Sequence, residues 1–535
     1  MNPEPLLDSV SAPATGFPWL REALAPSGAY GYAQFAAIVP FVPGQEEAAR
    51  NHAARIARIA SRLDPAALDE VREIVRNVPD AGGAVARASM GDVLDDAAFL
   101  ELQHFFDACE RLDAVTACCD DLPRTDSAPV RECARALEAG RAGRFGFYLD
   151  ERLDATLVSS RAALARAQAE YDGARGRAGA AVAAELDREI SLPEFIVMRD
   201  DLNGPLPPGV RVVRETPTYL LCELDADDAV LGALRRRDEA AIAVARAEED
   251  VRERLCAVIR SHAAALDVAM RAFGEVDVLT AAARFAQQHG CTVPVIASAG
   301  TLIFERARFL PLEAELRREG RAFTPIGLKL DDVAVLTGPN MGGKTAALRT
   351  CGFVALCAAF GLPVPARDAT VGLFADIAWL GVGSDTEREA TLLSSFAREV
   401  VRLRDVLSRG AGPRLVLIDE FARTTTPREG KALLVAVIER LRALGSCGLV
   451  ATHLGGIAEA AQARHFAVRG LRGIPKSPPS EDLGQALEML AASMDYTLEE
   501  VSGDRVREAD AIALASLLGI DAQVIDAAYD ALEPQ

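Results

Sequence analysis

The chain is poor in aromatic residues and lacks the patterns that mark zinc-binding or membrane proteins. Phe, Trp and Tyr make up 5% of its 535 residues, whereas half of all residues are hydrophobic. The ten cysteines form no C-x-x-C pair, which argues against a zinc ribbon or a thioredoxin-like motif and favours buried, reduced thiols. The N-terminus has no basic stretch followed by an apolar one, and no apolar run approaches the roughly 18 residues of a membrane span. We therefore expect a cytoplasmic protein with no membrane partner.

Acidic side chains outnumber basic ones. The 58 Lys and Arg residues face 78 Asp and Glu residues, which gives a formal net charge of −20. Because affinity for polyanions comes mostly from Lys and Arg, this balance lowers the expectation of non-specific nucleic-acid binding, although a local basic patch remains compatible with it. The length predicts two to four domains.

The first half of the chain is mainly helical in pattern. Residues 1–45 are rich in Pro, Gly and Ala and indicate an irregular lead-in, and 46–147 have the apolar spacing of a helical core or lever. Over 148–290 the pattern predicts two long helices that run out and back around a small β tip. An ordinary helical bundle with a β-hairpin insert is the alternative. The expected tip strands are Phe195–Met198, Val210–Val213 and Tyr219–Cys222.

Alternating strands and helices follow over 291–470. Three continuous apolar runs are typical of strands buried on both faces of a parallel sheet. These runs are Val333–Leu336, Leu415–Ile418 and Gly448–Ala451. Residues 471–535 predict a helical tail, with an exposed Pro- and Ser-rich loop at 475–480 and short helices at 509–518 and 521–532. The expected fold class is thus multidomain α and α/β.

A phosphate-binding motif lies between the first of these strands and a helix-like run. The stretch Thr337–Thr345 completes the pattern G-x-x-x-x-G-K-[ST]. Its glycines let backbone N–H groups face phosphate oxygens, Lys344 would reach the β- and γ-phosphates, and the Thr345 hydroxyl would hold Mg²⁺. A chance match by a glycine turn is the alternative. The expected nucleotide-binding residues are Gly338, Pro339, Asn340, Met341, Gly342, Gly343, Lys344, Thr345 and Ala346.

Two acids end the second apolar run. In an open α/β sheet, ligands bind at the carboxyl edge of the strands, where Asp419 is placed by this pattern. Asp419 can hold Mg²⁺ together with Thr345, and Glu420 can orient or polarise the attacking water. The alternative is an ordinary acidic pair on the surface after a strand.

Two further elements have weaker signals. His453 follows the third apolar run and would sense the γ-phosphate, although a lone His is more often structural. Ser394 and Ser395 precede a helix. They would either simply cap this helix or bind an anion at its start, and in a dimer that anion would be the γ-phosphate of the partner. The other five histidines lie on helix-like segments and receive no role: His52, His104, His262, His289 and His465.

Taken together, these motifs resemble those of the MutS mismatch-repair ATPases. Gly338–Thr345 matches the family form G-P-N-M-G-G-K-S/T, and Asp419–Gly430 aligns without gaps with D-E-[IL]-G-R-G-T-S-x-x-[DE]-G. Thr452-His453 matches the family's T-H, and Ser394-Ser395-Phe396 is similar to its S-T-F before a helix with a Glu, here Glu399. The resemblance covers roughly 50–535 and is specific over about 330–460.

The chain also departs from the family pattern. Ala422 and Thr424 replace the two glycines around Arg423, and Thr426 replaces a serine. From the length of the N-terminal part and the residues after the ATPase motifs, we expect neither a mismatch-reading domain with its connector nor a Smr-type nuclease tail. The form D-E-F-A-R-T-T-x-P-x-E-G is similar to a MutS-related branch associated with reactivating lysine 5,6-aminomutase, a cobalamin- and PLP-dependent enzyme.

The resemblance implies a helical lever and coiled-coil clamp joined to a C-terminal P-loop ATPase of the ABC type, with ATP and Mg²⁺ as cofactors. It implies a dimer with itself or a similar chain, catalytic roles for Glu420 and His453, and a switch role for Arg423 and Thr425. ATP hydrolysis would move the clamp on an aminomutase-type enzyme or, alternatively, on duplex DNA as in mismatch repair or recombination control. A scaffold gated by ATP is a third possibility.

Overall fold

The fold is described from a computed structural model of the chain. The described part of the chain contains thirteen strands, β1 to β13, together with the helices given below. The described residues are 1–4, 6–143, 146–190, 194–202, 204–298, 300–339, 342–381, 395–409, 412–423, 425–471, 494–501, 512, 515–516 and 520–532.

The chain divides into two compact units, each built from segments that are separated in sequence. One unit contains Met1–Asn77, Ala114–Pro123 and Ala272–Gln535, and the other contains Val78–Asp113 and Arg124–Arg271. This division differs from the sequence-based boundaries, because residues 1–77 and Ala114–Pro123 group with the nucleotide-motif region, whereas the rest of the expected helical core groups with the long helices. Such groupings depend on contacts between distant segments, which local patterns do not reveal.

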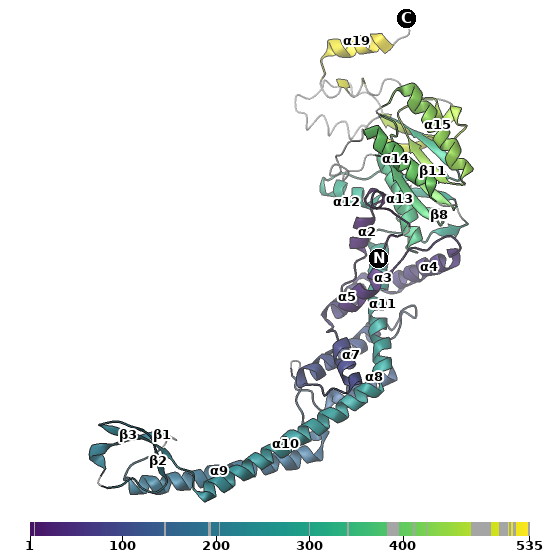
Figure 1. Ribbon diagram of the computed structural model, residues 1–535. Coiled ribbons are helices and arrows are strands. Elements are labelled where there is room, and N and C mark those ends of the chain that lie inside the picture. The colour runs from purple at the N-terminus through teal and green to yellow at the C-terminus, as the bar shows by residue number, and fades with distance from the viewer. Residues whose placement is uncertain are drawn as a thin grey trace. The chain divides into compact units, whose positions relative to one another are not determined.

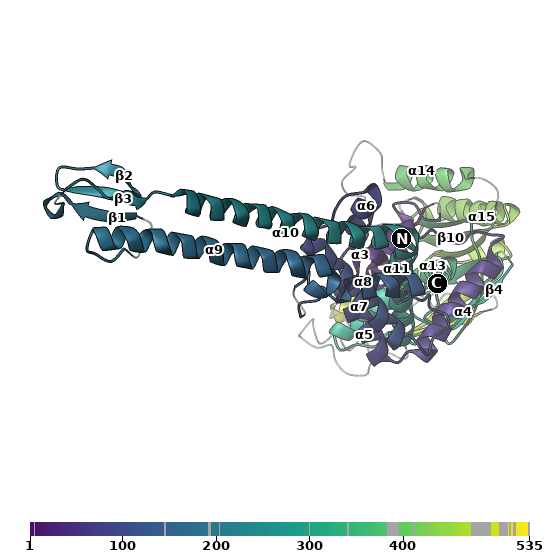
Figure 2. The same cartoon turned by 90° about the horizontal axis from the view of Figure 1, so that it is seen from below.

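The second unit consists of a helical base and two long helices that end in a small sheet (Figures 1 and 2). The long helices lie side by side, joined by ion pairs such as Arg161–Glu248 at 2.8 Å and Arg236–Glu170 at 3.2 Å. The sheet has the order β1-β3-β2 and is antiparallel. The elements of this unit are α6 (Gly82–Met90), α7 (Asp96–Val115, which ends in the other unit), α8 (Ala128–Glu138), α9 (Ala155–Glu185), β1 (Glu194–Met198), β2 (Val210–Glu215), β3 (Tyr219–Leu224) and α10 (Asp228–Ser261).

We call α9 and α10 the arms and the sheet β1–β3 the tip. The three strands lie where the sequence predicted them. Phe195, Val197 and Cys222 are buried on one face of the tip against the end of α9, whereas Ile196 and Met198 on the other face are exposed. This alternation follows from the period of two in β-strands.

The first unit contains two sheets. The larger has six strands in the order β13-β12-β7-β11-β10-β9, in which all neighbours are parallel except β12 and β13. The smaller has the order β4-β8-β5-β6. The strands are β4 (Val295–Ala297), β5 (Leu302–Ala307), β6 (Ile326–Leu330), β7 (Val333–Thr337), β8 (Asp368–Gly372), β9 (Asp376–Leu380), β10 (Arg414–Asp419), β11 (Cys447–Ala451), β12 (His465–Leu471) and β13 (Met494–Glu500).

The central strands are buried on both sides, as the apolar runs predicted. Alternate residues such as Val335, Val416 and Val450 form one core cluster with α14, α15 and α16. Helix α13 contacts β10 and β11 and is buried along most of its length. The helices of this unit are α1 (Ser11–Ala14), α2 (Phe17–Ala23), α3 (Ala29–Ala37), α4 (Glu46–Arg62), α5 (Pro65–Asn77), α11 (Ala263–Gln288, which begins in the other unit), α12 (Leu310–Arg318), α13 (Lys344–Ala359), α14 (Ser395–Ser408), α15 (Pro427–Ala443), α16 (Ile457–Ala460) and α19 (Ala522–Leu532).

The irregular lead-in expected at 1–45 is instead partly helical and tied into the first unit. Helices α1, α2 and α3 are short, and hydrogen bonds from distant segments hold the chain around them. Asp277 on α11, buried at 3% exposure, accepts hydrogen bonds from the N–H groups of Ser27 and Gly28 at 3.0 and 2.7 Å. The N–H of Ile377 on the outer strand β9 donates to the carbonyl of Leu6 at 2.9 Å.

The remaining sequence-based expectations have mixed outcomes. The helix expected at 521–532 is present as α19, whereas the loop at 475–480 and most of the helix expected at 509–518 lie outside the described residues. All ten cysteines are free, and all except Cys118 and Cys291 are buried. None of the described helices combines the length and apolar character that crossing a bilayer requires.

Candidate functional site: the glycine loop and the acidic strand end

The glycine loop connects β7 to α13. Strand β7 ends at Thr337 and α13 begins at Lys344. Gly343, at the N-cap of α13, has φ +87°, a conformation that glycine adopts without steric cost. A Cβ at Gly342 would lie 2.8 Å from the carbonyl oxygen of Pro339, so this position also requires glycine. Asn340 and Met341 lie outside the described residues.

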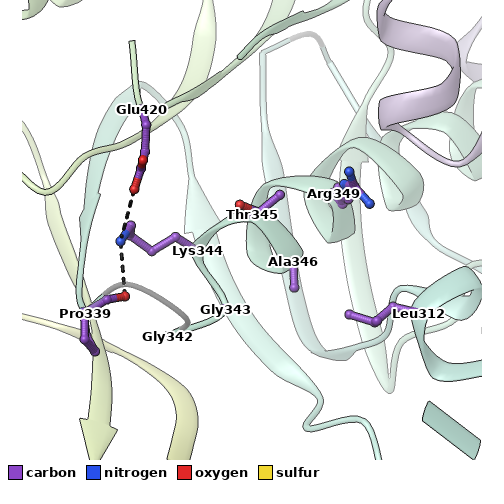
Figure 3. A pocket seen from close by; sticks show the side chains of 9 residues that line it. All are labelled: Leu312, Pro339, Gly342, Gly343, Lys344, Thr345, Ala346, Arg349 and Glu420. Atoms are coloured by element: carbon purple, nitrogen blue, oxygen red, sulfur yellow. Dashed lines mark hydrogen bonds and ion pairs between the residues drawn. The ribbon is translucent and has the colours of Figure 1, made fainter. Parts of the chain in front are cut away.

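Lys344 extends across this loop (Figure 3). Its Nζ donates to the carbonyl oxygens of Gly338 and Pro339 at 2.9 and 3.1 Å, and it lies 3.6 Å from the Glu420 carboxylate. Burial lowers the pKa of Lys344, while the charges of Glu420 and Asp419 act in the opposite direction. The Lys344 ammonium thus lies between the loop and the acidic strand end.

Asp419 reaches the loop because three parallel strands end in register. Asp419 pairs with Ala451 on β11, which in turn pairs with Leu336 on β7. The Thr345 hydroxyl donates to Oδ2 of Asp419 at 2.8 Å. Burial raises the pKa of the Asp419 carboxyl, and this hydrogen bond acts against that shift.

The donor set at Thr345 and Asp419 fits Mg²⁺. The second carboxylate oxygen of Asp419, Oδ1, is buried and has no hydrogen-bond partner among the described residues. A buried, unpaired carboxylate oxygen beside a hydroxyl provides two of the oxygen ligands that Mg²⁺ prefers. Within the described ranges, no three His, Cys, Asp or Glu side chains form a metal cluster.

Glu420 lies on the opposite side of the loop from α12. Its N–H donates to the carbonyl of Ala451 at 3.0 Å, and its backbone adopts φ +54°. The carboxylate is a quarter exposed and is 3.9 Å from Arg423 as well as near Lys344. A pocket of about 310 Å³ opens between these elements. It is lined by Leu312, Pro339, Gly342, Gly343, Lys344, Thr345, Ala346, Arg349 and Glu420 (Figure 3).

The turn after Glu420 leads directly into α15. Ala422 has φ +63°, which explains why glycine suits this position in the family pattern. Thr425 donates from its N–H to the Ala422 carbonyl at 3.3 Å and from its hydroxyl to Glu429 at 3.3 Å. Arg423 is exposed and faces Glu420. Thr424 lies outside the described residues.

Of the weaker candidates, His453 does not line the pocket. His453 is exposed, and among the described residues it makes no hydrogen bond or ion pair. Ser394 lies outside the described residues, and Ser395 is described only as the first residue of α14. Their proposed roles therefore stay predictions.

Four residues near the loop were missed by sequence reasoning. Leu312 and Arg349 line the pocket, and a Cβ at Gly343 would lie 3.0 Å from the ring of Tyr496 on β13. His465, expected on a helix and without a role, lies on β12, where its Nε2 is 2.7 Å from the Thr337 hydroxyl. No sequence signal marks these contacts, because each joins elements that are far apart in the chain.

The chain has recognisable relatives over this region. Residues 334–533 match the family model described as MutS domain V. The chain is 31% identical over 214 residues to an Endonuclease MutS2 of Pelotomaculum thermopropionicum, covering 39% of this chain and 26% of that protein. It is 28% identical over 256 residues to an Endonuclease MutS2 of Clostridium botulinum, covering 44% of this chain and 31% of the relative. An Endonuclease MutS2 of Carboxydothermus hydrogenoformans is 35% identical over 189 residues, which are 35% of this chain and 23% of the relative. Each alignment thus spans less than a third of the relative.

Proposed function

Because the C-terminal part of this chain belongs to the MutS family, we propose that the protein is an ATPase that couples ATP binding and hydrolysis to movement of the arms and tip. The observation that carries the proposal is that Lys344, Thr345 and Glu420 line one pocket and that Asp419 accepts the hydrogen bond of the Thr345 hydroxyl. These four side chains supply the cation, the metal ligands and the carboxylate that phosphoryl transfer to water requires.

In the proposed mechanism, ATP binds with its phosphates on the loop 338–345. Mg²⁺, held by Thr345 and Asp419, would neutralise charge on the β- and γ-phosphates. Lys344 would leave its carbonyl partners to contact these phosphates. Glu420 would then orient the attacking water and accept its proton, since its carboxylate lies across the pocket from α13.

Removing the Thr345 hydroxyl tests the metal assignment. Thr345→Val should raise the Mg²⁺ concentration that gives half-maximal phosphate release by about 10–100-fold, because the ion loses a ligand and Asp419 loses its hydrogen bond. Thr350→Val on the same helix is the matched control, since its hydroxyl bonds the Ala346 carbonyl within α13. EDTA should stop phosphate release by the unaltered protein. An unchanged Mg²⁺ dependence in Thr345→Val would contradict the assignment.

We further propose a dimer, either with itself or with a similar chain. In this arrangement Ser394 or Ser395 would face the γ-phosphate bound by the partner subunit. The proposal follows the sequence resemblance, and the catalytic role of His453 and the switch roles of Arg423 and Thr425 belong with it. For the arms to do work, the target must bind the ATP and ADP states with different affinity.

For the target of the arms, the printed names of the relatives favour duplex DNA. All three relatives described above are called Endonuclease MutS2, and no comparison supports the aminomutase-type enzyme. The ion pairs of the arginines on α10 argue against duplex DNA as the target. Within the run 235–237, Arg236 pairs with Glu170, while Arg237 pairs with Asp238 and lies over the Tyr171 ring. Only Arg235 of this run has no ion pair among the described residues.

A DNA titration at two salt concentrations separates these targets. If DNA is the target, a labelled duplex should bind at ~50 mM salt and weaken by roughly 10³-fold or more at ~200 mM, because bound phosphates release counterions. Arg235→Ala should then lower the salt slope by about one, whereas Arg318→Ala, an equal change of charge on α12, should not. Absent or salt-independent binding would point to a protein target.

A further inference from the structure

We propose that Glu399 on α14 is a positioning residue that holds the backbone turn on which Glu420 is presented to the pocket. The inference rests on the proposed ATPase function. Glu399 does not line the pocket and touches none of the expected reacting groups. Its carboxylate instead accepts a hydrogen bond from the N–H of Ala422 at 2.8 Å.

The turn that Glu399 holds is conformationally disfavoured. Glu420 and Ala422 both have positive φ, +54° and +63°, in a region that residues with a Cβ rarely adopt. Such a backbone persists only where the surroundings fix it. One anchor is the hydrogen bond from the Glu420 N–H to the Ala451 carbonyl on β11, and Glu399 provides a second anchor two residues later.

Helix α14 is itself held in place by hydrogen bonds to other segments of the first unit. Arg402, one turn after Glu399, donates to Asp8 at 2.6 Å and to the Trp379 carbonyl on β9. Arg409, just after the helix, donates to Asp376 at 2.6 Å. The helix is therefore joined to the lead-in and to the edge of the large sheet, and its contact with Ala422 has a defined position.

A second contact runs parallel to the hydrogen bond. The rings of Phe396 on α14 and Phe421 in the turn have centroids 6.5 Å apart, and Phe421 is buried. The apolar contact fixes the distance between helix and turn, whereas the Glu399 carboxylate fixes the direction of the Ala422 N–H. Loss of the carboxylate would leave that N–H without this acceptor, and the turn could relax toward negative φ. The Glu420 carboxylate would then move away from the water it orients.

The kinetic test compares Glu399→Ala with Glu399→Gln in the full chain. Because a displacement of about 1 Å can cost on the order of 10²-fold in rate, Glu399→Ala should lower kcat by about 10–100-fold with KM for ATP unchanged. Glu399→Gln keeps a carbonyl acceptor and should retain most of kcat. Arg398→Ala, the preceding exposed position on the same helix, is the matched control. Adding Ala422→Gly to Glu399→Ala should recover part of kcat, because glycine adopts the positive φ without support.

A second readout does not depend on turnover. In nucleotide-free protein, amide hydrogen exchange at Ala422 should be faster in Glu399→Ala than in Arg398→Ala, while the melting temperatures of the two variants stay similar. Unchanged kcat together with unchanged exchange in Glu399→Ala would overturn the proposal. So would a parallel loss of kcat, ATP binding and thermal stability, which would indicate a merely structural side chain. Failure of the proposed ATPase function would instead appear as absent phosphate release by the unaltered protein, with the exchange result still deciding the role of Glu399.

Discussion

Replacing Lys344 by alanine is expected to abolish nucleotide binding. The Lys344 ammonium is the cation closest to the glycine loop, with Nζ 2.9 Å from the Gly338 carbonyl, and it is only 5% exposed. Of the side-chain cations that line the pocket, Arg349 would remain, but the Lys344 ammonium is the one that lies on the loop itself, so affinity should fall by at least about 10²-fold. Binding of a fluorescent ATP analogue measures the effect.

The control for this change is Lys329→Ala. Lys329 lies on β6, is largely exposed and pairs loosely with Asp331 at 4.0 Å, so its removal changes the net charge equally without touching the pocket. The melting temperature of both variants should be recorded, since Lys344→Ala also removes one of the two cations beside Glu420. Retained ATP binding by a folded Lys344→Ala protein would contradict the assignment of the loop.

Replacing Glu420 by alanine should separate binding from turnover. The phosphate-binding loop and the metal ligands remain, so ATP should bind with similar or slightly higher affinity. Loss of the carboxylate that orients water should lower kcat by about 10²–10⁴-fold, the usual range for a general base. Steady-state phosphate release and nucleotide binding on the same sample measure the two effects.

Glu439→Ala is a suitable comparison for Glu420→Ala. Glu439 is exposed on α15, away from the pocket-lining residues, and its loss should leave both quantities unchanged. Normal steady-state hydrolysis by Glu420→Ala would refute the catalytic role. Loss of ATP binding in parallel with turnover would show that Glu420 instead supports the loop through Lys344.

The position of the candidate pocket was predictable because its signals are local. Each signal spans only a few residues: the apolar run that ends at Thr337, the glycines of the loop, and the acidic end of β10. Parallel strands then bring their carboxyl ends to one edge of the sheet. The tip strands were predictable for the same reason, since turn residues and alternating β-formers bound them closely.

The supports of the pocket could not be read from the sequence. Glu399 meets Ala422 across 23 residues, and Asp8 meets Arg402 across 394. The lead-in helices are short and lack a periodic apolar face, so tertiary contacts such as Asp277 to Gly28 decide their structure. His465 belongs to a strand because β7 and β13 pair with its segment, not because its own residues favour one.

The most direct test of the account measures bound nucleotide and released phosphate together, with Mg²⁺ and ATP, in the unaltered protein, Lys344→Ala and Glu420→Ala. We expect the unaltered protein to bind and release, Lys344→Ala to do neither, and Glu420→Ala to bind without release. Equal phosphate release by all three proteins would contradict the claim that Lys344 and Glu420 belong to one ATP-hydrolysing site.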